Sequence, residues 1–386
     1  MKILYGINTN GQGHINRARV FITELLKDGH DVHVLLAGKR PPAYAFDLAP
    51  KVFYKPGPID IYKDHEVALS KTLQANLKRL WKYANSRREL IQLDKKENFD
   101  VIFSDFEPLS STVGKQAKKP VICIDHQHSL FHSAVEEAPG RTSEKVGFKI
   151  VMNIMLPYYT HCYSLDFTDS IENCEDTTIF PLVWKQEFDD YEITNGNHFI
   201  AYLARYDQQQ IIDVFSQFPR ETFFVYGFNQ NKTVNNIQFK RTSRKGFLSD
   251  LVSSKAIIGN AGFNLAWEGC LAKKLLWLIP HKRQFEQITN AYRLQQRDLA
   301  FVSERVSIKN FQSFLEWIEE KQYQPTNELP VVDASLILSR VYRHIKDFYL
   351  DQFPVKRQIR RQIRQDVSRW RLKQKIRSMI NQELEI

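Results

Sequence analysis

The stretch from Ile257 to Ala300, IIGNAGFNLAWEGCLAKKLLWLIPHKRQFEQITNAYRLQQRDLA, decides the fold. It predicts a buried strand, a small-residue turn that includes Gly262, and a helix with one acid, Glu268. A second strand follows, then a polar loop with Glu286 and Gln287, and then another helix. Two successive strand-to-helix turns place polar groups at the carboxyl ends of neighbouring parallel strands, where open α/β sheets bind ligands.

The residue types in this stretch favour an anionic ligand that carries hydroxyl groups. Gly262 allows backbone N–H groups to approach a ligand closely, and the helix N-terminus that follows attracts anions such as a diphosphate. Glu268, about a turn and a half into that helix, is placed to accept hydrogen bonds from a pair of sugar hydroxyls.

The same segment resembles the nucleotide-sugar site of GT-B glycosyltransferases, namely the UDP-glycosyltransferases and the lipid-linked N-acetylglucosaminyltransferase of peptidoglycan synthesis. The shared elements, in order, are Gly262, Glu268, Pro280, Glu286-Gln287 and Asn290-Ala291. The resemblance implies that Glu268 binds the ribose hydroxyls and that Glu286 and Gln287 hold the donor sugar. The chain departs from the family at the Ser or Thr of the glycine turn, where it has Asn260, Ala261, Phe263 and Asn264; among these we take Asn264 as a donor-binding candidate.

The N-terminus predicts a strand, a turn with Gly11 and Gly13, a helix and a second strand. The turn is not a dinucleotide-binding motif, because position 16 is Asn16 and no acid ends the second strand, so NAD is disfavoured. It offers His14 at the start of a helix. The Gly-His turn is similar to that of UDP-glycosyltransferases, in several of which the histidine is the general base for the acceptor hydroxyl.

A histidine base needs a carboxylate beside it, and Asp105 at the end of a predicted strand is the first candidate. Asp125 and His126, which end the next strand, are expected to line the acceptor side of the cleft with Gly11 and Gly13. A second interpretation of His14 is a loop histidine that only binds acceptor or phosphate. His126 and His128 could instead form a metal pair, but without further ligand spacing we predict no metal site.

Length and composition indicate a packed globular protein with two large domains. The chain has 386 residues with a hydrophobic content of 43%, and no apolar run approaches membrane-spanning length. No signal peptide is evident, and four cysteines without framework spacing suit a cytoplasmic protein.

We therefore predict an α/β protein of the GT-B class, with two Rossmann-like α/β/α domains facing a cleft and a basic C-terminal helix. The expected parts are an acceptor domain at 1–180, a donor domain at 181–335 with an interdomain linker at its start, a helix returning toward the first domain at 336–354, and a basic amphipathic tail at 355–386. In the donor domain the resemblance nominates Arg205 beside the diphosphate and Phe247 in a loop beside the base.

Two basic segments lie outside the predicted sites. Residues 64–96 have a helical pattern with Leu69, Leu73, Leu77 and Leu80 as its apolar face, either a solvated helix or an element near the acceptor or membrane. The tail 355–386 has ten basic and three acidic residues, which accounts for +7 of the formal net charge of +10. The tail could lie on an anionic membrane, pack on the protein, or bind nucleic acid. Against the last alternative, the rest of the chain has no nucleic-acid recognition motif.

These features together predict a glycosyltransferase of the hexosyltransferase type. It would move a sugar from a nucleoside-diphosphate donor, UDP-linked by resemblance, to an acceptor hydroxyl on a lipid or membrane-borne glycan. The resemblance implies inversion and no metal, and no cofactor is expected beyond the co-substrate. The tail suggests peripheral binding to the inner face of the membrane. A nucleotide-sugar 2-epimerase and a non-catalytic nucleotide-sugar or membrane-binding protein are the alternatives.

Overall fold

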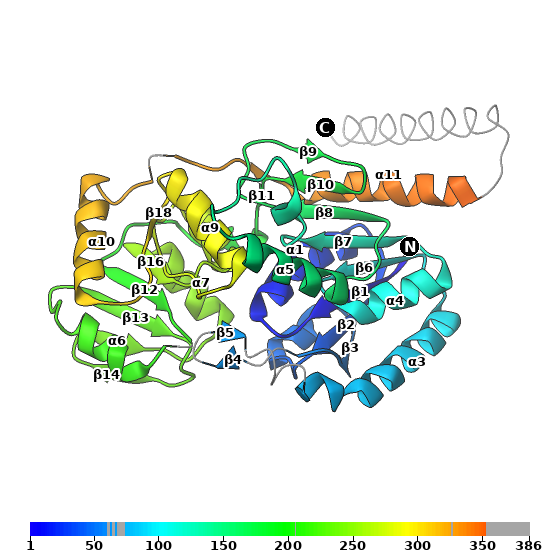
Figure 1. Ribbon diagram of the computed structural model, residues 1–386, viewed down its shortest axis with the longest axis horizontal. Helices are drawn as coiled ribbons and strands as arrows, with labels where there is room; N and C mark the ends of the chain where they lie inside the picture. Colours follow the sequence, from blue (N-terminus) through cyan, green and yellow to red (C-terminus); the bar gives the residue numbers. More distant parts are fainter. Residues whose placement is uncertain (60–61, 64–65, 68–73, 205, 326, 353–386) are drawn as a thin grey trace, which may run out of the picture. The chain divides into compact units, whose positions relative to one another are not determined.

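The computed structural model describes residues 1–59, 62–63, 66–67, 74–204, 206–325 and 327–352. The chain divides into two compact units, Met1–Ile337 and Leu338–Ile386. The first unit contains two large sheets, each with helices packed against it (Figure 1). The described part of the second unit is the end of α11 (Ala334–Gln352).

The first sheet has eight strands in the order β3-β2-β1-β6-β7-β8-β10-β9, and only β9 is antiparallel to its neighbour. Most of these strands are continuous apolar runs, as expected for a parallel sheet covered on both faces. They are β1 (Lys2–Asn8), β2 (Asp31–Gly38), β3 (Lys51–Pro56), β6 (Val101–Asp105), β7 (Val121–Asp125), β8 (His161–Leu165), β9 (Glu172–Asn173) and β10 (Thr177–Phe180).

Helices cover both faces of this sheet. Leu90 of α3 and Leu109 of α4 pack on one face with Ile102 of β6, so Asp105, an odd number of residues further on, points to the opposite face, where α1 lies. The elements are α1 (Gln12–Lys27), α3 (Leu80–Glu97), α4 (Pro108–Ala117), α5 (Thr142–Met155), the short turns η1 (Ala43–Asp47), η2 (Ser129–Phe131) and η3 (Gln186–Phe188), and the hairpin β4 (Tyr62–Lys63) and β5 (Glu66–Val67).

The second sheet has the order β14-β15-β13-β12-β16-β17-β18, with β14 antiparallel at the edge. Its strands are β12 (His198–Tyr202), β13 (Thr222–Tyr226), β14 (Lys232–Val234), β15 (Ile237–Phe239), β16 (Ala256–Gly259), β17 (Leu276–Leu278) and β18 (Ala300–Val302). Its helices are α6 (Gln208–Phe215), α7 (Arg244–Val252), α8 (Phe263–Leu271), α9 (Phe285–Gln296) and α10 (Ile308–Glu320).

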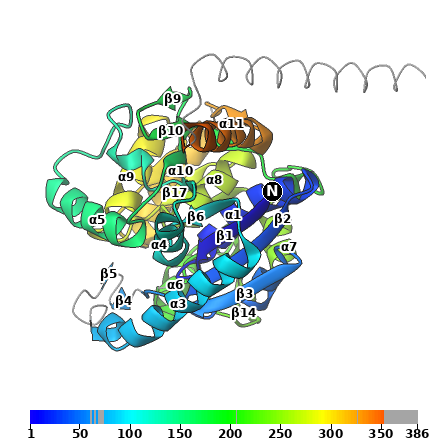
Figure 2. The same ribbon diagram turned by 90° about the vertical axis from the view of Figure 1, so that its right-hand side faces the viewer.

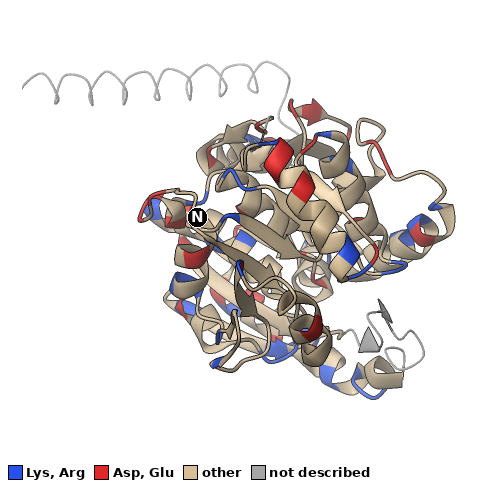
Figure 3. Cartoon of the chain, turned by 90° about the vertical axis from the view of Figure 1, so that its left-hand side faces the viewer, with Lys and Arg blue, Asp and Glu red and all other residues tan. Residues whose placement is uncertain are grey.

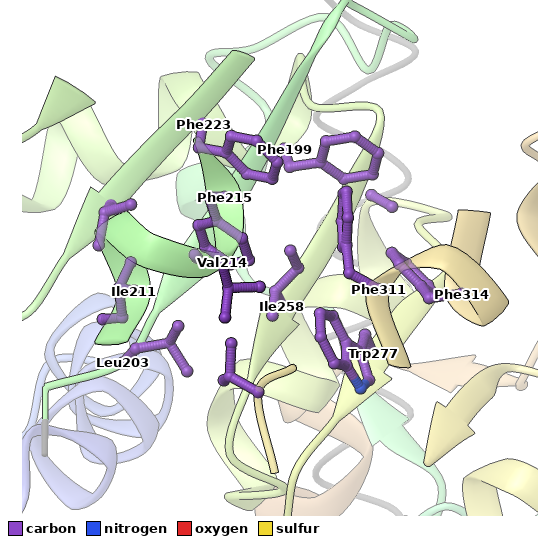
Figure 4. Packing of buried hydrophobic residues seen from close by; sticks show 14 of the residues in the cluster. Phe199, Leu203, Ile211, Val214, Phe215, Phe223, Ile258, Trp277, Phe311 and Phe314 are labelled. Atoms are coloured by element: carbon purple, nitrogen blue, oxygen red, sulfur yellow. The ribbon is translucent and has the colours of Figure 1, made fainter. Parts of the chain in front are cut away.

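An aromatic core holds α6 and α10 against this second sheet (Figure 4). Phe215 of α6 stacks on Phe223 of β13 with ring centroids 4.2 Å apart, and Phe311 and Phe314 of α10 pack on Trp277 of β17. Large aromatic side chains bury much apolar area each, so a few of them fix these helices in place.

The segment expected to be an interdomain linker contains a strand of its own. β11 (Leu182–Val183) pairs in parallel with β19 (Val331–Val332), which ties the crossing between the sheets to the chain beyond α10. The side chains of Leu182 and Val183 are buried, and the removal of their apolar surface from water favours a packed strand here over an exposed loop.

The prediction of one long helix at 64–96 is wrong in the extent of the helix and in the side chains of its apolar face. The hairpin β4–β5 occupies its start, residues 74–77 are helical, and α3 begins at Leu80 after a turn. Leu77, before α3, is 56% exposed. Leu80 is 58% exposed, because α3 packs through residues four apart on another side, namely Ser86, Leu90 and Asp94. Leu69 and Leu73 lie outside the described residues.

Basic and acidic residues are interspersed along the described part of the chain (Figure 3). The tail 355–386, which carries most of the net charge, lies outside the described residues. Among the helices that are described, none has the length and hydropathy needed to cross a membrane.

Candidate active site

A cleft of about 680 Å³ is lined from both sheets of the first unit. Its walls are the segments that follow the carboxyl ends of β1, β2, β12, β13, β16 and β17, which is where open parallel sheets bind ligands. The lining residues are Asn10, Gly11, Gln12, Gly13, Asn16, Pro42, Tyr44, Tyr202, Ala204, Gly227, Asn229, Thr242, Arg244, Phe247, Asn260, Asn264, Leu265, Glu268, His281 and Gln287.

The starts of α1 and α8 meet at this cleft. Gly11 precedes α1 and Gly262 precedes α8, and neither helix start has a side-chain cap. A Cβ on Gly13 would lie 2.6 Å from the Asn264 amide nitrogen, so a larger residue there would push the Asn264 side chain aside. A Cβ on Gly11 or Gly262 would meet nothing, which leaves the N-terminal N–H groups of both helices accessible to an anion.

Three side-chain oxygens around the cleft are buried without a hydrogen bond. They belong to Asn10, Asn16 and Asn264, and the described residues offer them no donor. An unsatisfied buried acceptor costs about 1–3 kcal/mol, and hydroxyl or amide groups of a ligand would relieve that cost. These asparagines therefore indicate a ligand that brings hydrogen-bond donors.

His14 and Asp105 are brought together as expected. His14 Nδ1 lies 2.7 Å from Asp105 Oδ1, and the carboxylate is fully buried while the imidazole is 16% exposed. Because a carboxylate can only accept, we assign the proton to Nδ1. Arg17 Nη2, which lies 2.9 Å from the same nitrogen, then donates to Asp105 Oδ1 and not to His14, and the Nε2 lone pair is left free for another proton. Phe106, in left-handed conformation at φ 54°, stacks parallel to the imidazole ring.

Arg17, which the sequence motifs did not predict, shares Asp105 with His14. Its Nε lies 2.9 Å from Asp105 Oδ2, and its Nη2 lies 2.5 Å from Oδ1. Burial alone would lower the pKa of Arg17, but Asp105 outweighs burial and the pKa is raised. Arg17 lies one helical turn after His14, and a cation three residues from a candidate base is the signal that could have found it.

Glu268 lines the cleft from α8 but is held by two cations. Lys185 Nζ lies 2.7 Å and Arg244 Nη1 lies 2.9 Å from Glu268 Oε1. Burial would raise the pKa of Glu268, yet Arg244 and Lys185 together lower it, so the carboxylate is ionised. Neither cation was predicted, because Lys185 is 83 residues away in the sequence and its pairing arises only from the fold.

Of the other donor-site candidates, Gln287 and Phe247 line the cleft and Glu286 does not. Gln287 lines the cleft and accepts the His281 backbone N–H at 2.9 Å, while Glu286 is outside the lining and lies 3.5 Å from Gln127 Nε2. Phe247 lines the cleft on helix α7, not on the expected loop, and packs edge-on against Tyr226. Arg205 lies outside the described residues.

Asp125 and His126 do not line the cleft, contrary to expectation. Both are fully buried, and His126 uses its two ring nitrogens on the Leu165 carbonyl and on Asn290 Oδ1 across to α9. His126 therefore joins the two halves of the unit, and its imidazole has no free nitrogen for an acceptor.

Asp125 instead belongs to a buried cluster with Cys123, His128 and Cys162, whose ligand-type atoms lie within 4.8 Å of one another. His128 Nδ1 and Asp125 Oδ2 are 2.6 Å apart, closer than the roughly 3 Å between ligand atoms around a tetrahedral zinc ion. Burial would lower the pKa of His128, but Asp125 raises it well above its usual value. Burial also raises the pKa of the Cys162 thiol to about 12, so the cluster is organised as a buried ion pair with neutral thiols.

The family model of glycosyl transferase family 1 matches residues 1–319, which span both sheets and every described residue of the cleft. The chain belongs to this family. It is a glycosyltransferase, and no curated protein sequence matches it.

Solved structures share the fold at low sequence identity. The glycosyltransferase SnogD from Streptomyces nogalater is 12% identical with a TM-score of 0.53, and the match covers 89% of this chain and 99% of that one. The spinosyn rhamnosyltransferase SpnG complexed with thymidine diphosphate is 10% identical with a TM-score of 0.54, and the match covers 88% of this chain and 99% of that one. The S. aureus MnaA-UDP structure is 10% identical with a TM-score of 0.55, and the match covers 92% of this chain and 98% of that one. The transferase thus has the GT-B fold, which confirms the predicted fold class.

Proposed function

We propose that the transferase moves a sugar from a nucleoside-diphosphate donor, with UDP as the nucleotide, to an acceptor hydroxyl. The observation that carries this proposal is the ionised Glu268 at the cleft, held by Lys185 and Arg244. Both cations approach Oε1, which leaves Oε2 to accept from the ribose hydroxyls. SpnG and MnaA were solved with thymidine diphosphate and UDP respectively, which supports a nucleoside diphosphate as the donor group.

The chemistry follows from the two sides of the cleft. His14 Nε2 takes the proton of the acceptor hydroxyl while Asp105 holds the ring in position. The acceptor oxygen attacks the anomeric carbon as the bond to the diphosphate breaks, so the configuration inverts and the diphosphate leaves with the electron pair. The uncapped start of α8 stabilises that charge, so the proposed reaction needs no metal or cofactor.

The remaining residues have supporting roles. Gln287, with Glu286 behind it, holds the donor sugar, and Asn264 and Phe247 contact the diphosphate and base. The acceptor is borne on a lipid or membrane glycan, which fits a cytoplasmic protein bound at the membrane surface. The basic tail 355–386 would add electrostatic attraction to anionic lipids.

Calorimetric titration of the Glu268→Gln variant with UDP tests the donor site. Charged hydrogen bonds contribute about 1.5–3 kcal/mol each, so we expect UDP to bind at least about tenfold more weakly. Lys185 would lose its buried partner, so folding must be verified by circular dichroism at the titration temperature. Glu316→Gln, an exposed acid on α10, is the control and should leave affinity unchanged. Affinity within about twofold of wild type for Glu268→Gln would refute the ribose assignment.

A further inference from the structure

Helix α5 is apolar on two opposite sides. Phe148, Met152 and Met155 point inward and pack with Phe106, Phe131 and Phe285. Val146, Ile150 and Ile154 repeat every fourth residue on the outer side and are 57%, 57% and 59% exposed. A helix side that is apolar normally packs on a partner, and the outer side of α5 has none among the described residues.

We propose that this outer stripe of α5, Val146, Ile150, Val151 and Ile154, docks on an anionic lipid bilayer. The inference deepens the proposed function, because it rests on a membrane-borne acceptor. Lys149 lies within the stripe, is exposed, and has no ion-pair partner among the described residues. Apolar side chains inserted at the headgroup boundary with lysine beside them are the features of a helix that lies in a membrane interface.

The helical residues 74–77 and the start of α3 together supply a second apolar and basic surface. Leu77, Leu80 and Trp81 are 56%, 58% and 66% exposed. Residues 74–97 carry seven basic and three acidic side chains, a net charge of +4. Figures 1 and 2 place this end of α3 on the same side of the unit as α5, at the left in Figure 2. Tryptophan favours the membrane–water interface because its ring is apolar and its N–H is polar.

Charge decides among the possible occupants of these surfaces. The tail 355–386 has a net charge of +7 and would be repelled by Lys149 and the basic start of α3. A symmetric dimer through these surfaces would bring the basic side chains of both copies into one interface, where like charges accumulate without acidic partners of their own. Anionic lipid headgroups attract lysine at both surfaces, and a bilayer can contact two separated apolar patches at once.

The stripe also connects to the reacting groups. Met152 and Met155 on the inner side of α5 pack on Phe106, which stacks on His14. Docking through α5 would therefore bring the bilayer surface, and an acceptor carried on it, to the side of the cleft where His14 lies.

Vesicle flotation of the full-length protein tests this surface, with equimolar phosphatidylglycerol and phosphatidylcholine against phosphatidylcholine alone. We expect wild type to bind the anionic vesicles and Ile150→Ser/Ile154→Ser to bind about tenfold more weakly, which corresponds to about 1.4 kcal/mol. Ile308→Ser removes an exposed isoleucine from the start of α10 and should bind like wild type. Equal binding of the double variant and wild type would overturn the proposal.

Two further readouts separate the outcomes. The double variant should bind UDP with the affinity of wild type, because the stripe lies outside the donor site. If the wild-type protein itself did not bind UDP, that result would count against the proposed function and not against this surface. Sedimentation velocity without vesicles tests the protein alternative. A dimer that the double variant converts to monomer would overturn membrane docking in favour of a second copy.

Discussion

At the residue scale, the pairing of His14 with Asp105 predicts the result of replacing the imidazole. His14→Gln keeps a side chain of similar reach but cannot take a proton, so sugar transfer should slow by about 10²–10⁴-fold. UDP affinity should stay within about twofold, since the donor residues lie on the other wall of the cleft. Steady-state kinetics with calorimetry measures both quantities.

The matched control is His30→Gln, which alters a histidine beyond the other end of α1 and should leave both quantities unchanged. If His14→Gln weakened UDP binding as strongly as it slowed transfer, His14 would be a phosphate-binding residue and not the base.

Glu107 predicts a pH dependence of stability that is unrelated to catalysis. It is buried, and its carboxylate caps α4 by accepting the N–H groups of Leu109 and Ser110 at 2.8 Å. Burial raises the pKa of Glu107 from 4.5 to about 7 despite those hydrogen bonds. Between these values the folded state binds more protons than the unfolded state, so stability falls as the pH rises through this window.

Urea unfolding at pH 5 and pH 8 measures this contribution. The loss of stability on going to pH 8 should be smaller in Glu107→Gln than in wild type by up to about 3 kcal/mol, because the amide does not titrate. Glu316→Gln, an exposed acid, should keep the wild-type dependence. An identical pH dependence in Glu107→Gln and wild type would show that Glu107 ionises normally.

At the element scale, two helical glycines should respond oppositely to alanine. A Cβ on Gly269 in α8 would lie 2.5 Å from Leu276 Cδ2 and 3.1 Å from Ile257 Cδ1, so α8 must move away from β16 and β17. A Cβ on Gly147 in α5 would meet nothing. We expect Gly269→Ala to lower the free energy of unfolding by about 1–3 kcal/mol and Gly147→Ala to raise it by up to about 1 kcal/mol.

Urea denaturation of the two variants provides the comparison, with UDP affinity as a second measurement. Gly269→Ala should also weaken UDP binding, because α8 carries Asn264 and Glu268. Equal stabilisation by both alanines would mean that the packing of α8 against the sheet adjusts without cost.

At the scale of the whole molecule, Arg293 of α9 holds the two halves of the first unit together. It is buried, pairs with Asp166 beyond β8, and donates from Nη2 to the Phe167 carbonyl at 2.8 Å. Arg293→Gln would leave Asp166 buried without its cation, so unfolding free energy should drop by about 3–5 kcal/mol.

Arg297→Gln, one turn further along α9, is the matched control. Its partner Asp169 is 66% exposed, and such pairs contribute about 0–1 kcal/mol. Calorimetric melting should therefore show a large shift, or separate transitions of the two halves, only for Arg293→Gln. Similar melting curves for both variants would refute this role for Arg293.

A nucleotide screen tests the complete cleft, since its walls come from both halves. A nucleotide at a hundred times its dissociation constant should stabilise the fold by about 2.7 kcal/mol. Thermal shifts with UDP, dTDP, GDP and CMP should be selective for UDP. A selective shift with another nucleotide would keep the donor site and correct its specificity.

The sequence by itself determined what depends on local order along the chain. The strand-turn-helix patterns around Gly262 and Gly11 predicted two α/β units, because hydrophobic periodicity and small-residue turns act over short spans. The GT-B class followed from the resemblance of these segments to known glycosyltransferases. The same local patterns placed His14 and Asp105 at the carboxyl ends of adjacent parallel strands, where they meet in the structure.

Only the tertiary structure decided which charges those groups meet. Arg17 shares Asp105, Lys185 and Arg244 neutralise Glu268, and His126 is sealed against Asn290. The exposure of Leu80 likewise depends on which side of α3 meets the sheet. Apart from Arg17, which lies three residues after the candidate base His14, these contacts join residues far apart in the chain. Burial strengthens them by removing water, and periodicity and spacing contain no signal for them.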